Sequence, residues 1–81
     1  MSQPVPSSLR DLVADTLEIA PEDVTPELNT ETAENWDSFR HLQLMLAVEG
    51  EYGVQFDPSL VAHLTTVAAI QDALQKKGVT L

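Results

Sequence analysis

Apolar residues recur at helical spacing in three parts of the chain, and the first of these lies near the N-terminus. From Ser8 to about Ile19, the spacing follows one face of a helix, which predicts an amphipathic helix. Ser7 or Ser8 is expected to cap its start, and Asp11 to interact favourably with the positive end of its dipole. The residues predicted to share the inward face are Leu9, Leu12, Val13, Thr16 and Leu17.

The strongest helical pattern begins at Asp37 and runs to about Tyr52, where Gly53 is well placed to end the helix. The side predicted to face the core carries Leu42, Met45, Val48, Glu49 and Tyr52, with His41 and Leu44 flanking it. The opposite side carries Arg40, Gln43, Ala47, Gly50 and Glu51. The Glu49 carboxylate is expected at the rim of the core.

Two further helices are predicted towards the C-terminus. Asp57 followed by Pro58 is typical of an N-cap and a first helical residue, so a short helix is expected through about His63. Thr65 or Thr66 is expected to cap the last helix. The residues of this helix that are predicted to point inward are Val67, Ile70, Ala73 and Leu74.

The last helix has Lys76 and Lys77 in its final turn and is expected to end at Gly78. The segment before the short helix is too short and isolated to predict a strand, so no credible pair of strands exists. The fold class is therefore all-α: a four-helix bundle of three main helices and one short helix. A single domain is expected over residues 1–81, with its core at about 7–78.

Residues 20–36 form a long connection with two prolines and five acids. A structureless loop of this length is unusual inside a compact domain. Val24, Leu28 and Trp36 are expected to anchor it to the core, and a short helical turn within it is possible.

Acidic residues dominate the charge: the chain has a net charge of −9, from thirteen acids against four lysines and arginines. Nine acids fall between Asp11 and Asp37, a stretch with no basic residue. Such a charge argues against nucleic acid or an anionic membrane as a partner, because phosphates would be repelled. It suits enzymes with basic docking surfaces, although a well-solvated surface explains it equally well.

The chain has no cysteine, so it can form no disulfide and offers no thiolate for metal binding or nucleophilic attack. Its N-terminus lacks the apolar run of a signal peptide, and no window approaches the length of a membrane span. A soluble, cytoplasmic and monomeric protein is expected.

The segment ENWDSFRHL, residues 34–42, contains the side-chain types of a catalytic triad in Asp37, Ser38 and His41. Their arrangement argues against a hydrolase, because no separate group would orient the histidine and no glycine-rich loop would form an oxyanion hole. The acids lack the spacing of a calcium loop, and two histidines alone make no zinc site. We therefore expect no catalytic residue and no metal.

Ser38 lies in the first turn of the second predicted helix, where it could simply help the helix to start. Asp37 is the better cap, since its carboxylate can accept the N–H of Phe39 or Arg40. The Ser38 hydroxyl is then left without a required structural role. A helix N-terminus also stabilises negative charge, which would favour a phosphodiester at this position.

The segment WDSFRHLQLMLAVEGEYGVQF resembles the acyl carrier protein family, whose pattern is Asp-Ser-Leu at the start of an apolar helix, then acids, an aromatic residue and glycine. The resemblance continues into the threonine-capped last helix. It implies that Ser38 carries 4′-phosphopantetheine, transferred from coenzyme A by a phosphopantetheinyl transferase, with Asp37 as the helix cap beside it. Acyl intermediates of fatty acid, polyketide or other specialised biosynthesis would then be carried as thioesters by a protein that is not itself an enzyme.

Several positions depart from the family pattern. Phe39 follows the serine in place of leucine, and Arg40 and Gln43 stand where fatty-acid carriers often have acids. Trp36 before the Asp-Ser pair resembles discrete carriers of specialised metabolism, and the glycine pair that usually precedes the serine in peptidyl carriers is absent. Arg40 also places a cation at the positive end of a helix, which either marks a functional contact or reflects an ion pair with Glu34 or Glu31.

These departures suggest a recognition surface for acyl-loading and acyl-processing enzymes. Two large apolar residues lie off the predicted core side, where they are either covered by the long loop or exposed for a partner. The residues proposed to bind partners are Phe39, Arg40, Gln43, Leu46 and Ala47. The alternative interpretation is an acidic helical interaction module that shares the fold and stays unmodified.

Overall fold

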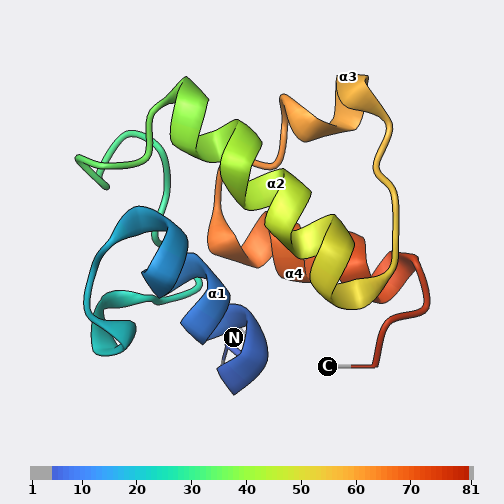
Figure 1. The fold of residues 1–81 in the computed structure, drawn as a ribbon, viewed down its shortest axis with the longest axis horizontal. Helices are drawn as coiled ribbons and strands as arrows, with labels where there is room; N and C mark the ends of the chain where they lie inside the picture. Colours follow the sequence, from blue (N-terminus) through green and yellow to red (C-terminus); the bar gives the residue numbers. More distant parts are fainter. Residues whose placement is uncertain (1–4, 81) are drawn as a thin grey trace.

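The computed structural model describes residues 5–80 and contains four α-helices and one short 3-10 helix in that range (Figure 1). The elements are α1 (Ser7–Leu17), η1 (Pro21–Asp23), α2 (Ser38–Tyr52), α3 (Pro58–Val61) and α4 (Val67–Lys76). No strand is present in this range, and an isolated bridge between Asn29 and Thr66 is the one β-type pairing. The predicted all-α fold is therefore confirmed.

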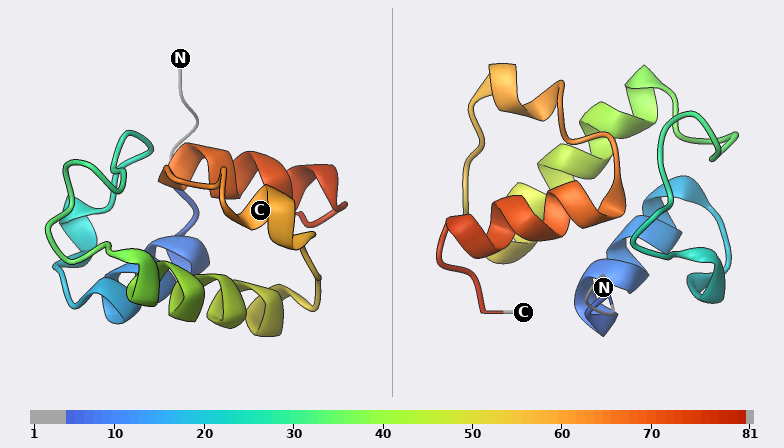
Figure 2. Two further views of the ribbon diagram at one scale, coloured as in Figure 1. Left: turned by 90° about the horizontal axis from the view of Figure 1, so that it is seen from above. Right: turned by 180° about the vertical axis from the view of Figure 1, so that it is seen from behind.

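Helices α1 and α2 lie in one layer, and α4 forms a second layer that crosses behind α2 (Figures 1 and 2). The core lies between these layers. Its buried apolar side chains are Leu9, Val13, Ala14, Leu17, Val24, Trp36, Leu44, Met45, Val48, Phe56, Leu64, Val67, Ile70, Ala73 and Leu74. None of the helices within residues 5–80 is long and apolar enough to cross a membrane.

Helix α1 begins differently from the sequence prediction. Its N-cap is Pro6, which makes no side-chain capping bond, and the helix already includes Ser7 and Ser8. The extended backbone of Pro6 starts the helix one residue early, so neither serine can act as the cap. The Ser8 hydroxyl instead lies 2.7 Å from the Tyr52 hydroxyl, and Asp11 falls beyond the first turn.

Helix α2 is rotated relative to the predicted core side. Leu44, Met45 and Val48 are buried, whereas the side chain of Leu42 is 58% exposed. The buried arc is centred between Met45 and Val48, which leaves Leu42 beyond its edge. Because leucines stand on both flanks of the arc, periodicity could not decide which of the two faces the core. The expectation that Leu42 points inward was wrong.

The long connection is anchored as expected, with Val24 and Trp36 buried and Leu28 partly buried. It also completes the start of α4. The N–H of Val67 donates to the Leu28 carbonyl at 3.0 Å, and the N–H of Ala68 donates to the Pro26 carbonyl at 3.0 Å. These N–H groups have no partner within their own helix, so the loop supplies the missing acceptors.

Side-chain caps explain the other helix ends. Asp57 accepts the N–H of Ser59 at 3.1 Å, and Thr66 accepts the N–H of Ala69 at 3.0 Å. Gly53 ends α2 in the left-handed conformation with φ of 65°, as predicted. Helix α3 is shorter than expected, because it ends at Val61. The buried Gln71 in α4 was not anticipated.

Candidate functional site

The junction between the long loop and α2 presents an exposed serine hydroxyl. Asp37 is the N-cap of α2, and its carboxylate accepts the N–H of Arg40 at 2.8 Å, as predicted. Ser38 is the first helical residue and is exposed. Its hydroxyl makes no hydrogen bond to any residue in the range 5–80. Since Asp37 performs the capping, the Ser38 oxygen is left available to a reagent from solvent.

His41 joins three segments beside this serine. The indole N–H of Trp36 donates to Nδ1 of His41 at 2.9 Å, and Nε2 of His41 lies 2.8 Å from the Val61 carbonyl oxygen. An indole nitrogen can only donate, so Nδ1 must be the acceptor and Nε2 must carry the proton. Both ring nitrogens are therefore used, and neither is available as a base for Ser38. The chain holds no catalytic triad here.

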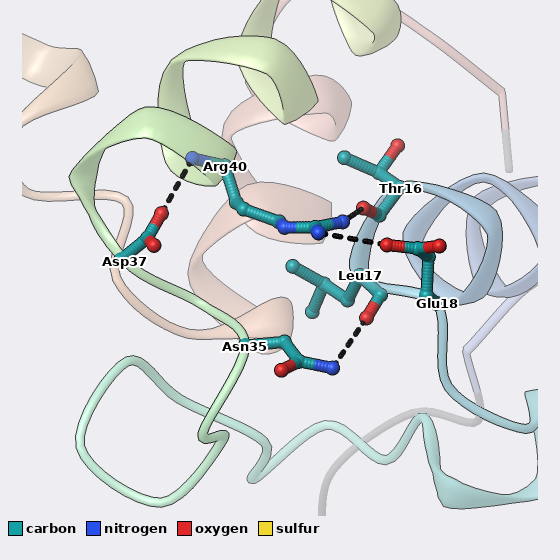
Figure 3. A network of polar contacts seen from close by, with 6 residues as sticks. All are labelled: Thr16, Leu17, Glu18, Asn35, Asp37 and Arg40. Carbon is teal, nitrogen blue, oxygen red and sulfur yellow. Dashed lines mark hydrogen bonds and ion pairs between the residues drawn. The ribbon is translucent and has the colours of Figure 1, made fainter.

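Two side chains near Ser38 bond to the C-terminal end of α1 (Figure 3). Nη1 of Arg40 donates to the Thr16 carbonyl at 2.8 Å, and Nη2 lies 2.7 Å from Oε2 of Glu18. Nδ2 of Asn35 donates to the Leu17 carbonyl at 2.9 Å.

The last carbonyls of a helix have no partner within it, and α1 has no basic residue in its last turn. Arg40 and Asn35 supply the donors that α1 lacks. The ion-pair partner of Arg40 is therefore Glu18, and not Glu34 or Glu31. Sequence reasoning missed Asn35 and Glu18, although a helix end without a cation was a usable signal.

Beyond Ser38, α2 exposes three large apolar side chains, which we call the apolar stripe: Phe39, Leu42 and Leu46. They are 67%, 58% and 64% exposed, respectively. At 100° per residue they fall within about 60° of one another on the helix. The loop covers none of them, which settles the open alternative for Phe39 and Leu46. Of their predicted neighbours, Gln43 is exposed and Ala47 is partly buried.

A small pocket of about 280 Å³ lies where α2 meets the segment leading into α3. Its lining is Leu42, Met45, Leu46, Glu49, Phe56, Pro58 and Val61. Oε2 of Glu49 accepts the N–H of Phe56 at 2.8 Å, so this rim carboxylate holds the segment beside the pocket. The pocket begins one helical turn after Ser38, about 6 Å along the axis.

Within residues 5–80, no group of three or more histidines, cysteines or acids is arranged to hold a metal ion. The site therefore has one chemical group of interest, the free hydroxyl at the N-terminus of a fifteen-residue helix. A negative charge attached there would be stabilised by the helix dipole and by free backbone N–H groups.

Comparison with known proteins agrees with this geometry. A family model described as a phosphopantetheine attachment site matches residues 7–74, from the start of α1 to the last turns of α4. A curated acyl carrier protein of Thermosynechococcus vestitus is 35% identical over 66 residues, which cover 82% of this chain and 82% of that protein.

Proposed function

Since the chain belongs to the acyl carrier protein family, we propose that Ser38 is the residue that carries its prosthetic group. Members of this family are carriers and not catalysts, and they bind 4′-phosphopantetheine covalently. The observation that carries the proposal is the exposed Ser38 hydroxyl at the start of α2. It has no structural role, because Asp37 caps the helix.

The attachment needs only an accessible oxygen from this chain. The Ser38 oxygen bonds to the β-phosphorus of coenzyme A, and the phosphoanhydride bond breaks to release adenosine 3′,5′-bisphosphate. The hydroxyl proton passes to the transferase, because His41 is occupied by Trp36 and Val61. The resulting phosphodiester lies at the positive end of α2, where its charge is favourable. The thiol at the end of the arm supplies the thioester chemistry that a chain without cysteine lacks.

The cargo of the arm is an acyl intermediate of fatty acid, polyketide or other specialised biosynthesis. The apolar pocket supports an acyl cargo, because it opens on the same side of α2 as Ser38, four residues further along the helix. Trp36 before the Asp-Ser pair favours specialised biosynthesis. A cytoplasmic location and a monomeric state stay predictions.

The partners are the phosphopantetheinyl transferase and the enzymes that load and process the acyl group. The net charge of −9 suits basic docking surfaces on these enzymes. We propose that they contact the apolar stripe together with Gln43 and Ala47. Such apolar residues surrounded by polar ones are typical of a docking surface. Arg40 was proposed for this surface too, but its guanidinium is already bonded within the chain.

Intact-mass spectrometry tests the attachment site. The purified chain is incubated with coenzyme A and a transferase of broad specificity, and it should gain the mass of one phosphopantetheine. Ser38→Ala should fold normally and gain nothing. Ser59→Ala is the control, since Ser59 is also an exposed serine in the first turn of an aspartate-capped helix, two residues after Asp57; it should be modified as the parent is. No gain in the parent would instead favour an unmodified interaction module.

A further inference from the structure

We infer that Arg40 and Glu18 form a clamp that fixes how Ser38 is presented to the transferase. The clamp consists of the ion pair between these two side chains and the bond from Arg40 to the Thr16 carbonyl. It makes Arg40 and Glu18 positioning residues, because neither touches the reacting atoms. This inference rests on the proposed attachment at Ser38.

Each clamp residue is a poor choice for its own helix end. Arg40 places a positive charge in the first turn of α2, against the helix dipole. Glu18 has φ of 57° and is the one residue other than glycine with positive φ within the range 5–80. Glycine is the usual residue at such a helix end, because a Cβ is disfavoured there. The 2.7 Å contact therefore joins two residues that are each unfavourable at their own helix end.

The contact between Arg40 and Glu18 explains why each residue is found at an unfavourable position. The Arg40 side chain carries its charge away from the positive end of α2 to the negative end of α1, where it bonds to Thr16. Figure 3 shows the Glu18 carboxylate directed at the same guanidinium. Glycine at position 18 would remove the strain but also the carboxylate. The sequence thus keeps a strained residue whose side chain joins the two helices.

The clamp lies next to Ser38 along the chain. Arg40 follows the serine by two residues, and Asn35 precedes it by three and bonds to the Leu17 carbonyl. The serine therefore lies between two side chains that are both fixed to the last turn of α1. Displacing a reacting group by about 1 Å can cost about a hundredfold in rate. Fixing the junction between the loop and α2 is therefore expected to affect the rate of the chemical step at Ser38 more than the affinity for a partner.

The competing interpretation is that Arg40 itself binds an acid on the transferase. The Arg40 side chain is 29% exposed and has two partners within the chain, which favours the clamp. The two interpretations predict different kinetics. Loss of a clamp should lower kcat, because the serine is misplaced in the docked complex. Loss of a direct contact should raise KM for the carrier.

The test measures transferase kinetics with the carrier as the varied substrate. Arg40→Gln and Glu18→Gln should each lower kcat by about tenfold and leave KM within about twofold. The charge-swapped double variant, Arg40→Glu with Glu18→Arg, should recover part of the lost kcat. A rise in KM for Arg40→Gln alone, with no effect of Glu18→Gln and no recovery in the swap, would overturn the clamp.

Glu18→Gly separates positioning from stability. Glycine suits the positive φ at this position, so the melting temperature should stay at or above that of the parent, while kcat still falls. A parental kcat in this variant would overturn the inference.

Amide hydrogen exchange tests the clamp without any transferase. Exchange at the amides of residues 40 and 41, which bond to Asp37, should be faster in Arg40→Gln and Glu18→Gln, whereas the amide of the buried Val48 should be unchanged. If the parent gains no phosphopantetheine, the proposed function fails, and this exchange experiment still decides on the clamp. Parental exchange rates in both variants would overturn it.

Discussion

Trp36 donates its indole N–H to Nδ1 of His41 across 2.9 Å, and this bond fixes the histidine in the tautomer protonated at Nε2. The same ring then donates to the Val61 carbonyl, so one side chain joins the end of the long loop to α2 and α3. The residue that most suggested a catalytic base is thus a structural bridge.

His41→Ala should lower the free energy of unfolding by about 1–3 kcal/mol, because the buried Trp36 N–H loses its acceptor. Urea unfolding followed by tryptophan fluorescence measures this. The exposed Gln43, two residues on, is the control: Gln43→Ala should stay within about 0.5 kcal/mol of the parent. Equal stability of the His41 and Gln43 variants would contradict the structural role of the bridge.

Leu42 and Leu44 test the rotation of α2. Leu44 is fully buried, so Leu44→Ala should cost about 2–5 kcal/mol. Leu42 is 58% exposed, so Leu42→Ala should change stability by no more than about 0.5 kcal/mol. The two substitutions remove the same atoms, and each therefore serves as the control for the other. A larger loss of stability for Leu42→Ala than for Leu44→Ala in urea unfolding would contradict the structure and support the core side predicted from the sequence.

Asp57 gives a pH dependence with a definite sign. The backbone N–H of Ser59, followed by its hydroxyl, lowers the pKa of Asp57 below its ordinary value of 3.8. A lowered pKa in the folded state means that the ionised cap stabilises the fold above pH 3.8. This stabilisation is lost as the pH falls through the lower, folded value.

The stability difference between the parent and Asp57→Asn should therefore be largest above pH 3.8 and shrink below it, as measured by thermal unfolding over an acidic series. Ser59→Ala removes the hydroxyl donor but keeps the N–H donor. The stability difference between the parent and Ser59→Ala should therefore shrink at low pH in the same way, but it should be smaller than the difference for Asp57→Asn. A difference that grows on acidification would refute this assignment.

Salt should raise the melting temperature. Of the nine acids between residues 11 and 37, only Asp11 and Glu18 form ion pairs within residues 5–80. The remaining acids repel one another, and ions screen such repulsion beyond roughly 10 Å at 0.1 M ionic strength. The combined variant Glu22→Gln and Glu27→Gln should respond less to salt than the parent. A flat response in the parent would show that this repulsion is unimportant.

The sequence predicted most of the helix ends, which depend on neighbouring residues, but not the start of α1, where Pro6 and not a serine is the N-cap. The caps at Asp37 and Asp57 were found, and Thr66 was one of two candidates, because a short polar side chain reaches a backbone N–H only two or three residues ahead. The glycine at position 53 was found for a similar reason. These features need no knowledge of the tertiary packing.

The candidate site was predicted less completely, because its contacts join distant parts of the chain. The free hydroxyl of Ser38 follows from the cap beside it, but the bonds of Arg40 and Asn35 depend on where α1 ends in space. The left-handed backbone of Glu18 gives no sequence signal, since glycine would be expected there. Leu42 and Leu44 are a second example. They lie on opposite flanks of the buried arc of α2, and only the packing of the other helices determines which of them is buried.

The hydrogen bonds between the long loop and the start of α4 also bear on folding kinetics. They pair Leu28 with Val67 and Pro26 with Ala68, residues that lie far apart in the sequence. Contacts of this kind close a large chain loop, so they are expected to form late, after the helices have docked. The loop leads directly into Ser38, so the segment before the proposed attachment site is expected to take its final place late in folding.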